Sequence, residues 1–144
     1  MPDTSRQPQP DRVSPPFAKP AVAAAFDAVP PEARTGLLRL RDLIFAIAAD
    51  LPQVPTVTED LRWGEPAYLT PPRIGTTIRL AVPKTGGFGL FTHCQTTVIP
   101  DFATAYPGWD RIDGTRGVLF DDPKQIDPVR HGALIRAALT YHLR

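Results

Sequence analysis

The order in which the apolar pattern changes its period along the chain is what most constrains the fold. From Pro31 to about Asp50, apolar residues recur at steps of three and four, which places them on one face of a helix. These residues are Ala33, Leu37, Leu40, Ile44, Ile47 and Leu51. From Thr76 to Val82, apolar and polar residues alternate instead, as in a strand with one buried face. Further strand patterns follow without a helix between each pair, which argues against a doubly wound parallel sheet.

Turn and cap residues predict the other elements. Asp127 and Pro128 are expected to open a C-terminal helix as its N-cap and first residue. Asp113-Gly114 is a strong hairpin signal, and Gly64-Glu65-Pro66 is expected to interrupt a strand. The expected helices are 21–28, 31–50, 97–106 and the C-terminal one, and the expected strands are 57–63, 67–70, 76–82, 88–94, 110–112 and 116–120.

This order of elements predicts an α+β domain. Its N-terminal and C-terminal helices should pack on one face of an antiparallel sheet. The other face is then free for solvent, a ligand or a second subunit. Arg39 and Asp42 lie off the apolar stripe of the long helix and are expected in solvent.

The proline distribution divides the chain into a tail and a domain. Six of the 18 prolines fall in the first twenty residues, where little else is apolar. We therefore expect a disordered tail over residues 1–20 and a single domain over 21–144, whose size suits one core. A Pro-rich tail can also dock on a partner's aromatic groove, which stays an alternative for this segment.

Composition excludes several classes of function. The net charge of +1 provides no strong field for nucleic acid or an anionic membrane. The only serines, Ser5 and Ser14, lie in the tail, so a serine hydrolase triad is not expected. A single cysteine forms no internal disulfide, and we see neither a signal peptide nor a membrane span. We expect a cytoplasmic protein.

Three short motifs suggest chemistry but fit turns or strands better. Gly86-Gly87-Phe88-Gly89 lies between two strands rather than before a helix, so it lacks the amide cluster of a phosphate loop. The 110–114 segment lacks the late glutamate of a calcium loop. His93 and Cys94 are expected on opposite faces of a strand, with Cys94 buried, so they form no nucleophile–base pair. No zinc-ligand spacing is present, and we find no catalytic set.

One set of polar and aromatic residues has the parity of the face that the helices leave open. Arg79, for example, alternates with Ile78 and Leu80. The candidate ligand-binding residues are Trp63, Glu65, Tyr68, Arg79, His93 and Arg116, with Phe91 beside them. Aromatic rings, one carboxylate and two guanidinium groups suit a small polar or anionic ligand. A homodimer interface and a purely structural role with a Glu65–Arg79 ion pair are the alternatives.

Four segments resemble a known bacterial family. They are Leu61–Thr70 (LRWGEPAYLT), Gly75–Arg79 (GTTIR), Phe91–Thr97 (FTHCQTT) and Ala138–Arg144 (ALTYHLR). Together they resemble, in the same order, the YdhG-like family, a domain of unknown function, over about Ala21 to Arg144. The resemblance implies a small intracellular α+β domain and no established catalytic residues.

Some members of that family are described as frataxin-like iron chaperones, which implies a carboxylate-rich site. In this chain the two N-terminal helices carry four dispersed acids, Asp27, Glu32, Asp42 and Asp50, among three arginines. The sequence thus predicts a non-enzymatic binding domain with no cofactor, and an iron chaperone or a homodimeric interaction protein as alternatives.

Overall fold

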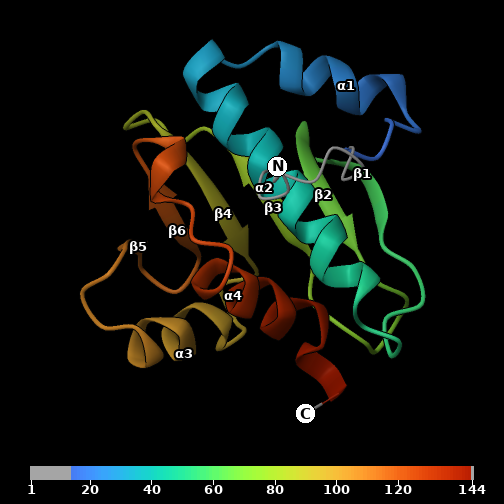
Figure 1. The fold of residues 1–144 in the computed structure, drawn as a ribbon, viewed down its shortest axis with the longest axis vertical. Coiled ribbons are helices and arrows are strands. Elements are labelled where there is room, and N and C mark those ends of the chain that lie inside the picture. Colours follow the sequence, from blue (N-terminus) through green and yellow to red (C-terminus); the bar gives the residue numbers. More distant parts are fainter. Residues whose placement is uncertain (1–13, 144) are drawn as a thin grey trace, which may run out of the picture.

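The computed structural model describes residues 14–143 as four α-helices and a single sheet (Figure 1). The helices are α1 Pro20–Asp27, α2 Pro31–Ala49, α3 Val98–Ala105 and α4 Arg130–Leu139. The strands are β1 Thr58–Arg62, β2 Glu65–Leu69, β3 Ile78–Ala81, β4 Phe88–Thr92, β5 Arg111–Asp113 and β6 Gly117–Phe120. Two short 3₁₀ helices, η1 Pro123–Gln125 and η2 Tyr141–Leu143, flank α4. The chain therefore has the predicted α+β fold.

The six strands form one antiparallel sheet in the order β1-β2-β3-β4-β6-β5. Four pairs of consecutive strands form hairpins, and the tight turns of β1–β2, β3–β4 and β5–β6 each contain at least one glycine. The Asp113-Gly114 hairpin is confirmed, with Asp113 paired to Gly117. The predicted interruption at Gly64-Glu65-Pro66 is confirmed at Gly64 but is wrong for Glu65 and Pro66. Trp63 and Gly64 make the turn, and Glu65 already pairs with Arg62 as the first residue of β2.

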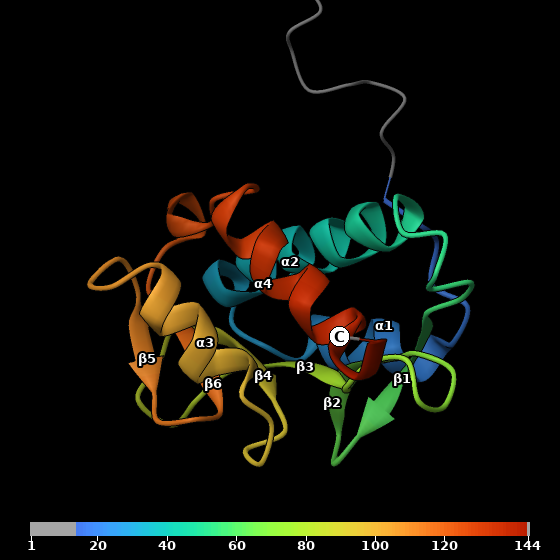
Figure 2. The same cartoon turned by 90° about the horizontal axis from the view of Figure 1, so that it is seen from below.

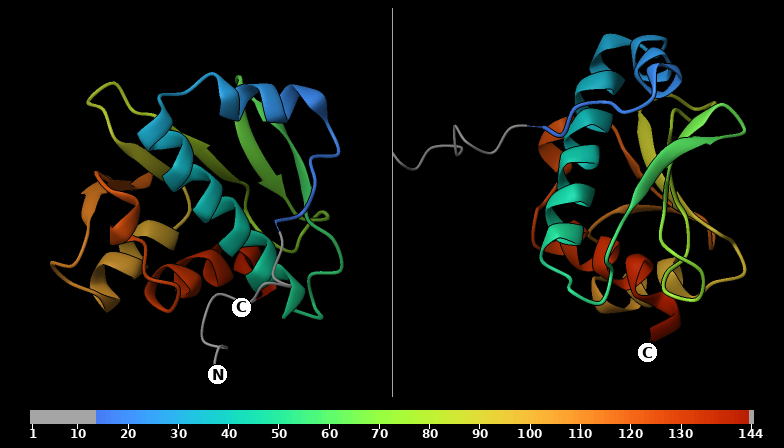
Figure 3. Two further views of the ribbon diagram at one scale, coloured as in Figure 1. Left: turned by 45° about the horizontal axis from the view of Figure 1, so that its top comes forward. Right: turned by 90° about the vertical axis from the view of Figure 1, so that its right-hand side faces the viewer.

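The helices lie on one face of the sheet, as Figures 2 and 3 show. Helix α2 crosses this covered face, α4 packs beside it, and α3 packs against α4. The covered face supplies the core: Ile78, Leu80, Leu90, Val118 and Phe120 are all buried. Strand alternation sends their neighbours, Arg79 among them, to the opposite open face.

The C-terminal helix starts two residues later than predicted, with Val129 as its N-cap and Arg130 as its first residue, although Asp127 caps the turn before it. The carbonyl oxygen of Asp127 accepts the N–H of His131, and its Oδ1 accepts the N–H of Val129 at 2.9 Å. This backbone hydrogen bond lowers the pKa of the Asp127 carboxyl. The regular helix α4 begins at Arg130, after a turn at Pro128 and Val129.

The polar side of α2 differs from expectation. Arg39 is exposed as predicted, but Asp42 is half-buried, and its Oδ1 is buried without a hydrogen-bond partner among the described residues. Its neighbour Arg41 is almost completely buried, with 1% of its surface exposed. Helical spacing alone places Arg41 beside the apolar stripe, and it becomes buried because a carboxylate and two backbone carbonyls meet it there.

The packed region begins before Ala21. The carbonyl oxygens of Pro15 and Pro16 accept hydrogen bonds from Arg41, and Phe17 packs its ring against Phe26 at 5.6 Å. The last residues of the predicted tail are thus fixed on the domain, while residues 1–13 lie outside the described residues. Over residues 14–143 no helix is long and apolar enough to cross a membrane.

Candidate functional site

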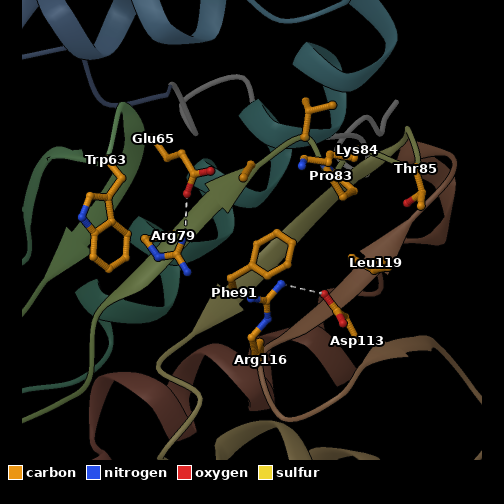
Figure 4. Close-up of a pocket in the computed structure, with 12 residues that line it drawn as sticks. Trp63, Glu65, Arg79, Pro83, Lys84, Thr85, Phe91, Asp113, Arg116 and Leu119 are labelled. Atoms are coloured by element: carbon orange, nitrogen blue, oxygen red, sulfur yellow. Dashed lines mark hydrogen bonds and ion pairs between the residues drawn. The ribbon is translucent and has the colours of Figure 1, made fainter.

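A shallow basin of about 680 Å³ lies on the open face of the sheet. Figure 4 shows its lining, which comes from β2, β3, β4 and the β5–β6 hairpin, with the β1–β2 turn at one side. Four of the six predicted residues line it: Trp63, Glu65, Arg79 and Arg116. Four residues that the alternation pattern placed on the open face therefore lie together in the structure, although they come from three different hairpins.

The β1–β2 turn presents Trp63 at the side of the basin. Its two central residues, Trp63 and Gly64, have φ of 53° and 77°. Positive φ at both positions is what a two-residue type I′ hairpin requires. Glycine adopts it freely, whereas a non-glycine residue does so at a cost. The turn leaves Trp63 87% exposed.

Arg79 on β3 occupies the middle of the basin. Its Nη1 donates to Oε1 of Glu65 on the neighbouring strand, and the two form an ion pair. Its guanidinium carbon lies 5.3 Å from the ring centre of Trp63 and 5.9 Å from that of Phe91. Nε and Nη2 make no hydrogen bond to the described part of the chain, and the side chain is 24% exposed. Arg79 therefore offers an unused hydrogen-bonding edge to the basin.

Phe91 forms the floor because two glycines make room for it. It pairs with Arg79 on one side and with Gly117 on the other. A Cβ built on Gly117 would approach the Phe91 ring to 2.4 Å, and one built on Gly89 to 2.8 Å. Both distances are below any ordinary contact, so the ring can lie on the strands only where side chains are missing.

The far side of the basin is more polar. Nη2 of Arg116 donates to Oδ2 of Asp113 at 3.3 Å; the Arg116 side chain is exposed and that of Asp113 is half-buried. Lys84, from the β3–β4 turn, is exposed and forms no ion pair among residues 14–143. With Arg79 and Glu65, the lining carries one more positive charge than negative. The basin therefore favours an anion.

Two predicted site residues lie elsewhere. Tyr68 is fully buried on the covered face, where its hydroxyl donates to Oε2 of Glu59 at 2.8 Å. The prediction for Tyr68 is wrong because β2 begins at Glu65, which gives Tyr68 the opposite parity. His93 follows the end of β4 in a turn and does not line the basin; its Nδ1 accepts the N–H of Gln95 at 3.1 Å. Cys94 beside it is exposed, not buried as expected.

Sequence patterns missed Lys84 and Asp113. Both flank turns, where alternation no longer tells which face a side chain takes. Asp113 is placed by the register that aligns it with Gly117 and Phe91 across three strands. The one sequence signal that could have placed Asp113 is the Asp113-Gly114 hairpin. It predicts the pairing of β5 with β6, and β6 in turn pairs with the strand of Phe91.

Beneath α2, an unexpected buried ion pair occupies the covered face. Nε and Nη2 of Arg41 donate to the two carboxylate oxygens of Glu59 at 2.6 and 3.0 Å. Burial lowers the pKa of Arg41, but the hydrogen bond and charge of Glu59 outweigh it, so the pKa lies above its ordinary value. Burial and the Glu59 charge both raise the pKa of Tyr68. These groups are fully engaged with one another, and we assign them to the fold.

A second buried cluster joins α4 to the segment after α3. Asp110 accepts from Nε and Nη2 of Arg130 and lies 3.0 Å from Nε2 of His131. The N–H of Asp127 donates to Nδ1 of His131 at 2.8 Å, so Nδ1 is unprotonated and Nε2 carries the proton. Burial lowers the pKa of His131, against the opposing charge of Asp110. His131 is thus a neutral imidazole with both nitrogens in use.

Comparisons with protein-family models, with curated proteins and with solved structures give no match to this chain. The YdhG-like resemblance therefore stays a prediction. Within residues 14–143, no three His, Cys, Asp or Glu side chains gather to form a metal-binding group.

Proposed function

We propose that this protein is a small binding domain that holds an anionic ligand on the open face of its sheet. The observation that carries the proposal is the unused edge of Arg79. A guanidinium presents its donors as a rigid planar fork that matches the two oxygens of a carboxylate or phosphate. Glu65 fixes this fork from one side, and Nε and Nη2 stay available to a ligand.

The surroundings of Arg79 support the same function. Partial burial between Trp63 and Phe91 removes some of the water that weakens surface ion pairs. Lys84 and Arg116 add positive charge on the other side of the basin. The described residues that line the basin include no nucleophile–base pair, and the proposal is therefore one of binding.

The test is a titration with three probes: benzoate, cyclohexanecarboxylate and inorganic phosphate. Backbone amide shifts in ¹⁵N–¹H spectra would report the site. We expect saturable shifts on β2 and β3 with at least one carboxylate. Arg79→Lys keeps the charge but loses the fork, so affinity should fall about tenfold or more, because hydrogen bonds to charged groups contribute about 1.5–3 kcal/mol.

The matched control is Arg39→Lys, which changes an exposed arginine of α2 outside the basin and should leave affinity unchanged. Lys84→Gln should weaken binding, and Lys124→Gln, an exposed lysine outside the basin, should not. The proposal fails if none of the three probes shifts the basin amides. It also fails if sedimentation shows a dimer that Trp63→Ala dissociates, because the open face would then belong to a second copy.

A further inference from the structure

Trp63 lies at a position where it adds nothing to the hydrophobic core. It is the most exposed of the large apolar side chains in the described part of the chain. A type I′ turn prefers Asn, Asp or Gly at its first central position, and a bulky residue with positive φ strains the backbone. An aromatic ring left in water also forgoes the burial that usually makes such residues stabilising. Neither turn chemistry nor core packing accounts for tryptophan at this position.

The hairpin nevertheless holds the indole in a defined place. Two-residue turns fix the register of their strands, here with Arg62 opposite Glu65. Glu65 in turn anchors Arg79, whose guanidinium carbon lies 5.3 Å from the Trp63 ring centre. The exposed ring and the free guanidinium edge are therefore presented together at the side of the basin.

The second exposed tryptophan provides an internal comparison. Trp109 also lies beside an arginine, with the guanidinium carbon of Arg130 4.9 Å from its ring centre. All three nitrogens of Arg130, however, are committed to Asp110 and Asp127. Among residues 14–143, the combination of an exposed indole and an arginine with two unused nitrogens occurs at Trp63 and not at Trp109.

We propose that the ligand of this basin is an aromatic oxyanion, a carboxylate or phosphate joined to a flat ring. Its oxygens bind the free edge of Arg79, and its ring stacks on the indole of Trp63. The net positive charge of the lining suits a negatively charged ligand. Phe91 is only 6% exposed, so Trp63 is the ring that the basin offers for stacking. This inference rests on the proposed function and specifies its ligand class.

The test compares benzoate with cyclohexanecarboxylate, which has the same charge and ring size but no aromatic face. Dissociation constants come from the amide shifts of Glu65 and Arg79. We expect benzoate to bind about three- to tenfold more tightly, which is the range that aromatic pairing contributes beyond buried area. Trp63→Leu should abolish this preference and Trp63→Phe should restore part of it. Trp109→Leu should leave it unchanged.

Each result separates the inference from the proposed function. Equal affinities for the two acids, with the Arg79→Lys effect intact, would overturn the aromatic class and leave anion binding standing. A preference for benzoate that survives in Trp63→Leu would also overturn it, since the ring would then be recognised elsewhere. If neither acid nor phosphate shifts the basin amides, the proposed function itself fails, and the inference fails with it.

Discussion

An arginine–glutamate pair lies on each of the two faces of the sheet, and the pairs differ in how many guanidinium nitrogens donate hydrogen bonds. On the covered face, Arg41 is buried and its three nitrogens donate to Glu59 and to two backbone carbonyls. On the open face, only one nitrogen of Arg79 donates a hydrogen bond within the described residues, and its acceptor is Glu65. A buried charge must have every donor satisfied, whereas a charge at the surface can leave donors to water. Water can be displaced by a ligand, so the same residue types are structural on one face and available on the other.

The largest effect should come from breaking the covered pair. Arg41→Ala leaves the buried Glu59 carboxylate without its counter-charge, and breaking a buried pair in this way costs about 3–5 kcal/mol. Urea denaturation would measure the free energy of unfolding. Arg39→Ala, an exposed arginine on the same helix, should change it by less than about 0.5 kcal/mol. Similar values for the two variants would show that Arg41 does not hold the covered face together.

A smaller decrease in the free energy of unfolding should follow when a methyl group is introduced between α2 and the sheet. A Cβ on Gly36 would lie 2.1 Å from Phe88, whose ring is buried and stacked on Phe120. Such overpacking costs about 1–3 kcal/mol, against roughly 1 kcal/mol that alanine gains over glycine in a helix. We expect Gly36→Ala to lower the free energy of unfolding by about 1 kcal/mol.

The open face supplies the contrast to this substitution. Gly117→Ala crowds Phe91 comparably, but that ring can move outward into the basin. Its loss of stability should therefore be the smaller of the two. A larger loss for Gly117→Ala would mean that the floor of the basin is as rigid as the core.

The free energy of unfolding should depend on pH through His131, which is buried on the covered side of the sheet. His131 is neutral in the fold, and burial holds its pKa below the ordinary value. The unfolded chain therefore binds more protons as pH falls through about 6.5, and the free energy of unfolding should decrease from pH 7.5 to 5.5. Urea midpoints across this range would measure the slope. His131→Phe should flatten it, and His142→Gln, an exposed histidine, should not.

How much of this arrangement could be predicted depends on the range of the interactions. The apolar stripe of α2 and the alternation of Ile78, Arg79 and Leu80 are local patterns, and they gave the helices, the sheet and the open face. Tyr68 was misplaced because the turn before it uses a tryptophan with positive φ, which no common turn rule anticipates.

The buried polar groups depend on contacts that local patterns do not contain. Arg41 and Glu59 are 18 residues apart, and Asp110 and His131 are 21 apart. An arginine on a helix is normally solvated, so only the three-dimensional structure shows that Arg41 and Arg130 form ion pairs with Glu59 and Asp110. The candidate basin could be predicted in part. The alternation of side chains along the strands identified Trp63, Glu65 and Arg79, whereas the turn residue Lys84 was found only in the structure.

The smallest effect on stability should come from the open pair itself. Arg79→Gln and Glu65→Gln, alone and together, form a double-mutant cycle that isolates their interaction. Because both side chains are partly exposed, the coupling should be about 0.2–1 kcal/mol, well below that of the covered pair. A coupling above about 2 kcal/mol would place Arg79 with Arg41 as a structural residue, since surface pairs rarely exceed 1 kcal/mol. A weak coupling, together with lost benzoate binding in Arg79→Gln, would show that Arg79 contributes more to binding than to folding, which is the difference between the two faces in its sharpest form.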